Sequence, residues 1–488
     1  MNQLSANNLP TSAVLYKYDR DAVSAGIVHF GIGNFHRAHQ AVYCDDLLNR
    51  GSTQWSIIGV SLRSSKVYES LKSQDYLYTL ATLAGAPEYR IIGAIKDILV
   101  APRNPQAVID VIADTTTQVV SSTITEKGYC LDSGKVDFEH PGLRAECISL
   151  NEPKTIYGYL ARGIAKRRHA VGPGYKLTIM CCDNISSGGE TLQSGVHHLL
   201  SLHDPAALAW CQKNVSFVSS MVDRVCPSTD HALRESVGRD IHLQDAWPVS
   251  TEPFSQWIIQ DGFAGRRPEF DTVGAAFVDD IAPFEQMKLR YLNAAHSIVS
   301  TLGYLSGAQF VHEALAQTEI LNFTRQILQE SILPNAPVPE GYDGAAYFEQ
   351  VLERLQNGSL PYANLQVGTD SSQKIQQRWF PTIDQAIGRN ADTSHFEFCL
   401  AAWVVFIQKA LANGVLSDPK KVVFENVDTE DIEHIVMSYL AIADADRFEF
   451  SAQTEFAASV VQHAKNISAF GLMQTLVEYQ SSPELGQL

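Results

Sequence analysis

The stretch GIVHFGIGNFHRAHQ, residues 26–40, is the strongest indication of the fold in this chain. Residues 26–31 are apolar and β-rich, which predicts a buried strand, and residues 35–50 have a helical pattern. Between them, Gly31 and Gly33 let the backbone turn tightly and approach a pyrophosphate, which the start of a helix favours electrostatically. The third glycine of the usual G-x-G-x-x-G motif is replaced by His36, so a plain strand-to-helix turn is the alternative.

The position of this turn, after the first strand and before a helix, favours a dinucleotide site. The residues predicted to hold the dinucleotide at the turn are Gly31, Ile32, Gly33, Asn34 and Phe35. His36 and His39 either pack against the strand or contact the dinucleotide, and the sequence leaves both open.

The rest of the N-terminal part alternates short β-rich runs with helical patterns, which is typical of an α/β sheet. Further strands are expected at 55–62, 118–125 and 175–183, and helices at 104–114 and 154–168. From about Pro283 the pattern becomes mostly helical, with helices expected at 284–305, 308–331, 343–356, 396–413, 428–443 and 452–479. We therefore predict a Rossmann-like NAD(P)-binding domain over residues 1–283 and a mostly α-helical substrate and catalytic domain over residues 284–488. Ligand sites favour the seam between two domains.

The end of the second strand bears on which dinucleotide binds. An acidic residue there would bind the ribose hydroxyls of NAD, and a basic one would bind the 2′-phosphate of NADP. The sequence from Val60 to Lys66 contains no acid, and Arg63 and Lys66 are either phosphate ligands or solvated surface charges. These residues leave the coenzyme undecided between NAD and NADP, and our working expectation is NAD, with NADP possible.

Composition excludes several classes of protein. A net charge of -17 argues against binding to nucleic acid or an anionic membrane. No apolar run reaches the ~18 residues of a membrane span, and the N-terminus has no basic region followed by an apolar one. The eight cysteines are scattered and form no zinc-binding pattern, so we expect reduced thiols in a cytoplasmic protein without a bound metal.

Three polar side chains in FEQMKLRYLNAAHS, residues 284–297, point to chemistry. With Lys288 at 0° on an α-helix, His296 falls near ~80° and Asn293 near ~140°, so all three share one side with His296 in the middle. An amine, an amide and an imidazole on one arc suit proton abstraction, oxyanion stabilisation and hydroxyl positioning. The alternative is a surface lysine beside two satisfied core residues.

Together, GIGNFHRAHQ (31–40) and K-x₄-N-x₂-H (288–296) resemble the mannitol dehydrogenase family, the polyol-specific long-chain dehydrogenases and reductases. The resemblance extends from about residue 13 to about residue 480. Further matching motifs, in the expected order, are TITE (123–126), CDN (182–184), MVDR (221–224), EPF (252–254) and SQK (372–374). The resemblance implies metal-independent hydride transfer between a nicotinamide cofactor and a secondary alcohol of a sugar alcohol or sugar acid.

The resemblance also implies roles for individual residues. Lys288 matches the catalytic lysine, which acts as the general base in alcohol oxidation. Asn184 and Asn293 match the pair that holds the alcohol or carbonyl oxygen, and His296 matches the histidine that orients substrate. The matched substrate-pocket residues are Asp223 and Lys374.

The residues agree with this chemistry. A lysine has a pKa near ~10.4 in solution, but burial can lower the pKa towards the ~7–8 that suits a base. Glu285, one helical turn before Lys288, either relays its proton to solvent or is an ordinary first-turn acid. Glu126 either borders the nicotinamide or simply ends its strand.

The substrate is less well defined. The motifs WSIIGV (55–60), GYC (128–130) and DAWPV (245–249) look like mannitol 2-dehydrogenases, which interconvert mannitol and fructose. LQV (365–367) and SSQK (371–374) look more like fructuronate reductases, and Gln366 stands where mannitol enzymes usually carry an arginine. We favour mannitol and fructose, with mannonate and fructuronate as the alternative, and another polyol such as arabinitol or sorbitol after them.

The remaining expectations concern catalytic competence and oligomeric state. A catalytically silent dinucleotide sensor is disfavoured, because such a protein would be free to lose a member of the lysine, asparagine and histidine set. The resemblance also implies a monomer.

Overall fold

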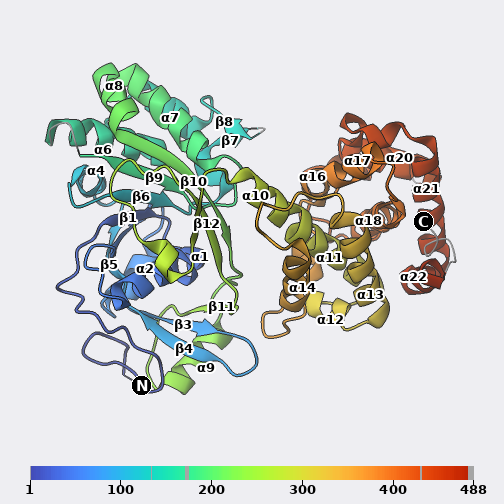
Figure 1. Cartoon of the computed structure of the whole chain (residues 1–488), viewed down its shortest axis with the longest axis horizontal. Coiled ribbons are helices and arrows are strands. Elements are labelled where there is room, and N and C mark those ends of the chain that lie inside the picture. The colour runs from blue at the N-terminus through green and yellow to red at the C-terminus, as the bar shows by residue number, and fades with distance from the viewer. Residues whose placement is uncertain (1, 133, 171–174, 429–430, 482–488) are drawn as a thin grey trace. The chain divides into compact units, whose positions relative to one another are not determined.

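The structure is a computed structural model that describes residues 2–132, 134–170, 175–428 and 431–481. The chain forms two compact units, Met1–Ile281 and Ala282–Leu488, called unit 1 and unit 2 below (Figure 1).

The strands of unit 1 are β1 (Ile27–Phe30), β2 (Ile57–Ser61), β3 (Tyr78–Thr82), β4 (Glu88–Ile92), β5 (Ile95–Val100), β6 (Val119–Ser122), β7 (Leu131–Asp132), β8 (Lys135–Val136), β9 (Leu177–Cys181), β10 (Val215–Asp223), β11 (Val249–Thr251), β12 (Gln256–Gln260) and β13 (Ala276–Val278). Its helices are α1 (Asn34–Ala38), α2 (Gln40–Asn49), α3 (Lys66–Lys72), α4 (Pro105–Ala113), η1 (Glu126–Tyr129), α5 (Pro141–Ile148), α6 (Ile156–Ala170), α7 (Gly188–His203), α8 (Pro205–Asn214), α9 (His231–Ile241) and η2 (Phe270–Val273).

A sheet of eight described strands organises unit 1, in the order β13-β12-β10-β9-β6-β1-β2-β5. From β5 to β10 all neighbouring strands are parallel, and only the β10–β12 pair is antiparallel. Helices α4, α6, α7 and α8 cover one face of the sheet, and α1 and α2 lie on the other (Figure 1). This arrangement confirms the predicted Rossmann-like domain.

The sequence of β1 explains its central place in the sheet. All four residues are buried, as expected for a parallel strand covered on both faces. Ile27 packs into the core on the α2 side, and Val28 and Phe30 pack into the core on the α6 side. The alternation follows from the two-residue period of a strand, so a one-residue slip would exchange the two faces.

Unit 1 also contains two small sheets that the sequence analysis did not predict. One has the order β11-β3-β4, in which β3 pairs antiparallel with β4 and parallel with β11. The other is the short hairpin β7–β8. The pairing of β3 with β11 joins segments about 170 residues apart, which local periodicity cannot reveal.

Unit 2 is mostly helical in its described residues, as predicted, and its only described β-pairing is an isolated bridge between Phe310 and Ala363. Its elements are α10 (Ala282–Lys288), η3 (Leu289–Asn293), α11 (Ala294–Ser306), α12 (Val311–Leu315), α13 (Thr318–Gln326), η4 (Ile327–Ile332), α14 (Gly344–Leu355), α15 (Asn364–Val367), α16 (Ser371–Arg378), α17 (Phe380–Gly388), α18 (Ser394–Ala412), α19 (Lys421–Glu425), α20 (Ile432–Ile442), η5 (Ala445–Arg447), η6 (Glu449–Ala452), α21 (Thr454–Phe470) and α22 (Leu472–Ser481). The helix expected at 428–443 begins at Ile432, and residues 429–430 lie outside the described residues.

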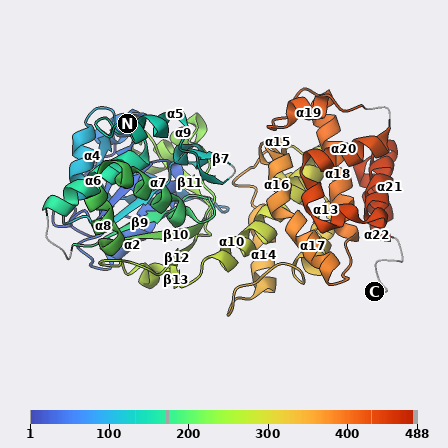
Figure 2. The same cartoon turned by 90° about the horizontal axis from the view of Figure 1, so that it is seen from above.

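Helix α18 forms the centre of unit 2 and packs against α11, α20 and α21 (Figure 2). Among the described helices it alone is long and apolar enough to cross a membrane, with a mean hydropathy of 1.3 over its most apolar stretch. Two thirds of that stretch, 67%, is buried inside unit 2, so core packing accounts for its composition.

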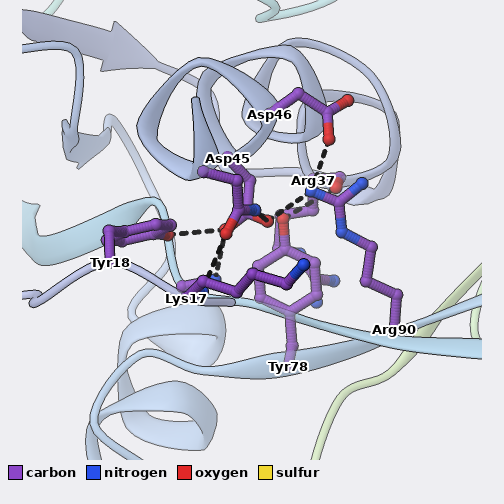
Figure 3. Close-up of polar contacts among 9 residues, drawn as sticks. Lys17, Tyr18, Arg37, Asp45, Asp46, Tyr78 and Arg90 are labelled. Atoms are coloured by element: carbon purple, nitrogen blue, oxygen red, sulfur yellow. Dashed lines mark hydrogen bonds and ion pairs between the residues drawn. The ribbon is translucent and has the colours of Figure 1, made fainter. Parts of the chain in front are cut away.

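A buried carboxylate ties the N-terminal segment of unit 1 to its sheet layers (Figure 3). Asp45 of α2 is fully buried and accepts hydrogen bonds from the Tyr18 hydroxyl (2.5 Å) and the Gly93 amide (2.9 Å). Arg90 of β4 donates to the same carboxylate at 2.5 Å and also pairs with Asp46 at 2.7 Å. Because Tyr18 precedes β1 while Arg90 and Gly93 belong to β4 and the residue after it, this carboxylate fixes α2 against the chain before β1 and against the small sheet.

We predict that Asp45→Ala lowers the free energy of unfolding by about 3–5 kcal/mol, because it removes the buried acceptor and leaves Arg90 with one partner. Asp46→Ala is the matched control, since its side chain is 37% exposed and contacts the same arginine, and it should cost about 1 kcal/mol or less. Urea titration followed by tryptophan fluorescence measures both. Equal losses in the two variants would contradict the role of burial.

Candidate functional site

The carboxyl ends of the parallel strands bring the predicted residues of unit 1 to one edge of the sheet. Strand β1 leads into Gly31, β6 into Thr123, β9 into Asn184, and β10 ends at Asp223. The strand order reverses between β1 and β6, and ligands of open α/β sheets bind at such a switch point. The edge therefore has the topology of a nucleotide site.

Glycine is required at position 31 by both space and backbone conformation. Gly31 has φ +98, and a Cβ on it would lie 1.9 Å from the Thr123 carbonyl oxygen. Gly33 differs, because a Cβ there would meet no protein atom within 4 Å. The space beside Gly33 is thus open to a bound group, which fits the predicted approach of a pyrophosphate.

The other turn residues make protein contacts with their side chains. Ile32 is buried and fills the space over Gly59. The Asn34 amide donates to the Pro227 carbonyl (2.9 Å) and the Thr229 hydroxyl (3.0 Å). Phe35 stacks on His39, with ring centroids 5.1 Å apart. These contacts anchor the turn from three sides.

His36 occupies the third glycine position of the motif for a structural reason. Its ring stacks on His29 of β1 at a centroid distance of 3.6 Å, and both residues are fully buried. His29 also bonds to the hydroxyls of Ser121 and Thr123, each at 2.8 Å. Burial lowers the pKa of His29 to about 3 and the pKa of His36 well below its usual value, so two neutral rings fill the space between helix and strand.

The end of β2 carries the two basic residues that bear on the coenzyme. Arg63 and Lys66 are both exposed beyond Ser61. The Ser61 hydroxyl donates to the Ser64 carbonyl (2.5 Å), and the Lys66 amide donates to the Ser64 hydroxyl (3.2 Å), which shapes a tight turn. The turn presents basic side chains and no carboxylate of its own.

Asp183 holds the loop that carries Glu126. It accepts from the Ile124 amide (2.6 Å) and from the Tyr129 hydroxyl (2.6 Å). Thr125 in this loop has φ 66, a left-handed conformation that costs a non-glycine residue energy and is often found at functional sites. Glu126 is exposed at the start of η1 and close enough to raise the pKa of Asp183, although burial is the larger cause. Asn184 follows Asp183 directly and is also exposed.

Asp223 lies at the last position of β10, where it is 5% exposed and pairs in register with Gln256 of β12. The predicted residues are thus divided between the units. Unit 1 supplies Asn184, Asp223 and Glu126, and unit 2 supplies the residues described next.

The helix that carries Lys288 differs from the expected regular α-helix. Residues Leu289–Asn293 form a π-helical turn between α10 and α11. An ideal π-turn takes roughly 4.3 residues instead of 3.6, which would bring Asn293 to about 60° and His296 to about 0° from Lys288. On this ideal geometry the three side chains share a narrower arc than on a regular α-helix. Single π-turns are frequent at functional sites.

The environment of this row of three residues suits a ligand. Lys288 is only 9% exposed, and Glu285 lies one turn before it, half-buried. Nε2 of His296 is buried and has no hydrogen-bond partner in the protein. Burial, with the positive charges of Arg378, Lys374 and Arg354, lowers the pKa of His296 to about 3.

Helix α16 supplies two of those charges. The Lys374 amine donates to the Val367 carbonyl (3.1 Å) and the Thr369 hydroxyl (3.4 Å), while Gln366 is exposed. Arg378, four residues after Lys374 on the same helix face, was not among the predicted site residues. The only signal in the sequence was that spacing, which an ordinary exposed helix would also show.

Two family models match the chain. The mannitol dehydrogenase Rossmann domain matches residues 25–272, and the mannitol dehydrogenase C-terminal domain matches residues 280–468. The chain belongs to the mannitol dehydrogenase family. This confirms the family indicated by the motifs, and it makes the chain an oxidoreductase that acts on a secondary alcohol.

Three similar proteins differ in their substrates. D-mannonate oxidoreductase of Escherichia coli is 33% identical, with 88% of this chain and 90% of the relative covered. Polyol:NADP oxidoreductase of Gluconobacter oxydans is 32% identical, with coverages of 82% and 84%. The ternary complex of Pseudomonas fluorescens mannitol 2-dehydrogenase with NAD and D-mannitol has a TM-score of 0.83 at 32% identity, with coverages of 99% and 100%.

The lowered pKa of His296 allows a test of its environment by pH titration. We predict that the His296 ring signal in NMR stays that of a neutral imidazole from pH 8 to about 4, since its pKa is about 3. Because the folded pKa lies below the unfolded value of about 6.5, His296 contributes stability that is lost as pH falls from about 6.5 towards 3. The control is the urea-unfolded chain, where the signal should titrate near ~6.5. A midpoint near 6.5 in the folded protein would contradict this environment.

Proposed function

We propose that this protein is an NAD-dependent mannitol 2-dehydrogenase, which interconverts D-mannitol and D-fructose without a metal. The observation that carries the proposal is the row of Lys288, Asn293 and His296 on the π-turn, with a buried amine beside a neutral imidazole. The P. fluorescens enzyme bound to NAD and D-mannitol, similar over nearly its whole length, supports this choice of substrate and coenzyme.

In this proposal unit 1 binds the coenzyme, and unit 2 supplies most of the groups that act on the substrate. A nicotinamide coenzyme bound there would supply the acceptor for the hydride of the alcohol carbon. Lys288 removes the hydroxyl proton, because its burial disfavours the charged ammonium and favours the free amine. Asn184 and Asn293 are the proposed amide donors that stabilise the developing oxyanion.

The remaining predicted residues have supporting roles. His296, neutral and with Nε2 unpartnered, orients a substrate hydroxyl by a hydrogen bond. Glu285 passes the proton from Lys288 to solvent, and Asp223 and Lys374 bind other hydroxyls of the open-chain substrate. Gly31 and Gly33 leave room for the pyrophosphate, and Glu126 lies in the loop predicted to border the nicotinamide.

NADP is the second candidate coenzyme. The exposed Arg63 and Lys66 at the end of β2 suit a 2′-phosphate, and the G. oxydans relative is a polyol:NADP oxidoreductase. A preference for NADPH would assign these two side chains to the phosphate.

A sugar acid is the second candidate substrate, and one observation favours it. Arg378, Lys374 and Arg354 all place positive charge at His296, where a terminal carboxylate would be stabilised. Gln366, in place of the arginine usual in mannitol enzymes, and the E. coli D-mannonate oxidoreductase point the same way.

The proposal also covers cellular location, oligomeric state and binding partners. All eight cysteines are free thiols, which suits the reducing cytoplasm. We propose a cytoplasmic monomer that has small-molecule partners and binds neither nucleic acid nor membrane, in keeping with its net charge of -17.

We expect initial rates of NADH oxidation to be higher with fructose than with fructuronate under identical conditions, in line with the similarity to the mannitol-bound P. fluorescens enzyme. Initial rates with fructose and with fructuronate, each measured with NADH and with NADPH, compare all four pairs of substrate and coenzyme. A rate with fructuronate that exceeds the fructose rate with either coenzyme would overturn the mannitol assignment in favour of mannonate.

We predict that Lys288→Ala lowers kcat at least about a hundredfold, the contribution expected of a general base, and leaves the Kd for NADH unchanged. The matched control is Lys409→Ala, because Lys409 is an exposed lysine of unit 2. Steady-state rates and fluorescence titration with NADH provide the two readouts. Near-normal kcat in the Lys288 variant would refute the proposed base.

A further inference from the structure

The π-turn between α10 and α11 is held from outside by two consecutive side chains. The Arg378 guanidinium donates through one nitrogen to the Asn293 carbonyl (3.1 Å) and to the Ser297 hydroxyl (2.7 Å). The next residue, Trp379, donates its indole N–H to the Ala294 carbonyl (3.4 Å). These two carbonyls lie where the π-turn ends and the α-helix resumes.

The bonds from Arg378 and Trp379 matter because the change from α-helical to π-helical hydrogen bonding sets the direction of the Asn293 side chain. Backbone carbonyls need partners when buried, and a donor from another helix compensates for the irregular ladder. If Leu289–Asn293 reverted to α-helix, Asn293 would rotate from about 60° to about 140° away from Lys288. The amide would then point away from the oxygen on which Lys288 acts.

The guanidinium of Arg378 is also unusual in its surroundings. Burial lowers the pKa of Arg378 to about 10, with no acidic group contributing to the shift. Burial is the main cause of the lowered pKa of His296, and the charge of Arg378 adds to it, as do those of Lys374 and Arg354. Removing the half-buried guanidinium from water costs free energy, and its hydrogen bond to a backbone carbonyl partly offsets that cost.

We propose that Arg378 is a positioning residue for the reaction: by binding the Asn293 carbonyl and the Ser297 hydroxyl, it locks the π-turn and so aims the Asn293 amide at the substrate oxygen. This inference rests on the proposed function, since it takes Asn293 as a donor to that oxygen. Arg378 itself acts through Asn293 and not on the substrate.

A double-mutant cycle tests the proposal. Arg378→Met should lower kcat about a hundredfold, the cost expected of a displacement near 1 Å, and change KM by less than about threefold. In an Asn293→Ala background the same change should lower kcat by less than about threefold, because the group it positions is gone. Arg378→Lys, which keeps the charge and places its N–H donors on a single nitrogen, should retain the fold and recover part of kcat.

The cycle distinguishes positioning from direct substrate binding. If the kcat losses of Arg378→Met and Asn293→Ala multiply, or if KM rises while kcat is unchanged, the proposal is overturned. Arg389→Met is the matched control, because Arg389 also donates to a carbonyl, that of Pro334 at 2.5 Å, but is exposed and its acceptor lies outside the π-turn. It should leave kcat and KM unchanged.

Hydrogen exchange provides a readout that needs no substrate. In Arg378→Met, amide exchange should accelerate in peptides covering residues 289–297 and remain unchanged in peptides from α18. Unchanged exchange at 289–297 would overturn the proposal. If the wild-type protein failed to oxidise mannitol, the proposed substrate would be wrong, while the exchange experiment would still decide the role of Arg378.

Discussion

A single shift in a backbone hydrogen-bond pattern sets up the chemistry proposed for unit 2. Between Leu289 and Asn293 the helix takes a π-turn, and a lysine, an asparagine and a histidine that a regular helix would spread over an arc of about 140° come together within about 60°. Lys288 is buried and His296 is half-buried on this helix. The main-chain geometry of the turn sets the direction in which each side chain leaves the helix.

Unit 1 depends on an equally local constraint, the close approach of Gly31 to the Thr123 carbonyl. It brings the ends of β1 and β6 together at the point where the strand order reverses, and it leaves space beside Gly33. In the usual motif a third glycine lets the helix pack closely on the strand, whereas here the stacked rings of His29 and His36 fill the space between them. The turn is therefore kept although the glycine motif is incomplete.

Much of this architecture could be predicted because its signals are local. Strand β1, the turn at Gly31 and the long helices of unit 2 each follow from periodicity over a few residues. The π-turn could not be predicted, since the run from Leu289 to Asn293 has no composition that distinguishes it from α-helix. Arg378 was missed because its bond to Asn293 spans 85 residues, and the small sheet of β3 and β11 was missed for the same reason.

We propose that Lys288 and Asn293 act on one oxygen of a polyol, and a crystal structure of the protein with NADH and mannitol would show the contacts of that oxygen. We expect one secondary hydroxyl oxygen to lie within about 2.6–3.2 Å of both Lys288 Nζ and Asn293 Nδ2. A hydroxyl that is bound elsewhere, or that is held by a metal ion, would contradict it.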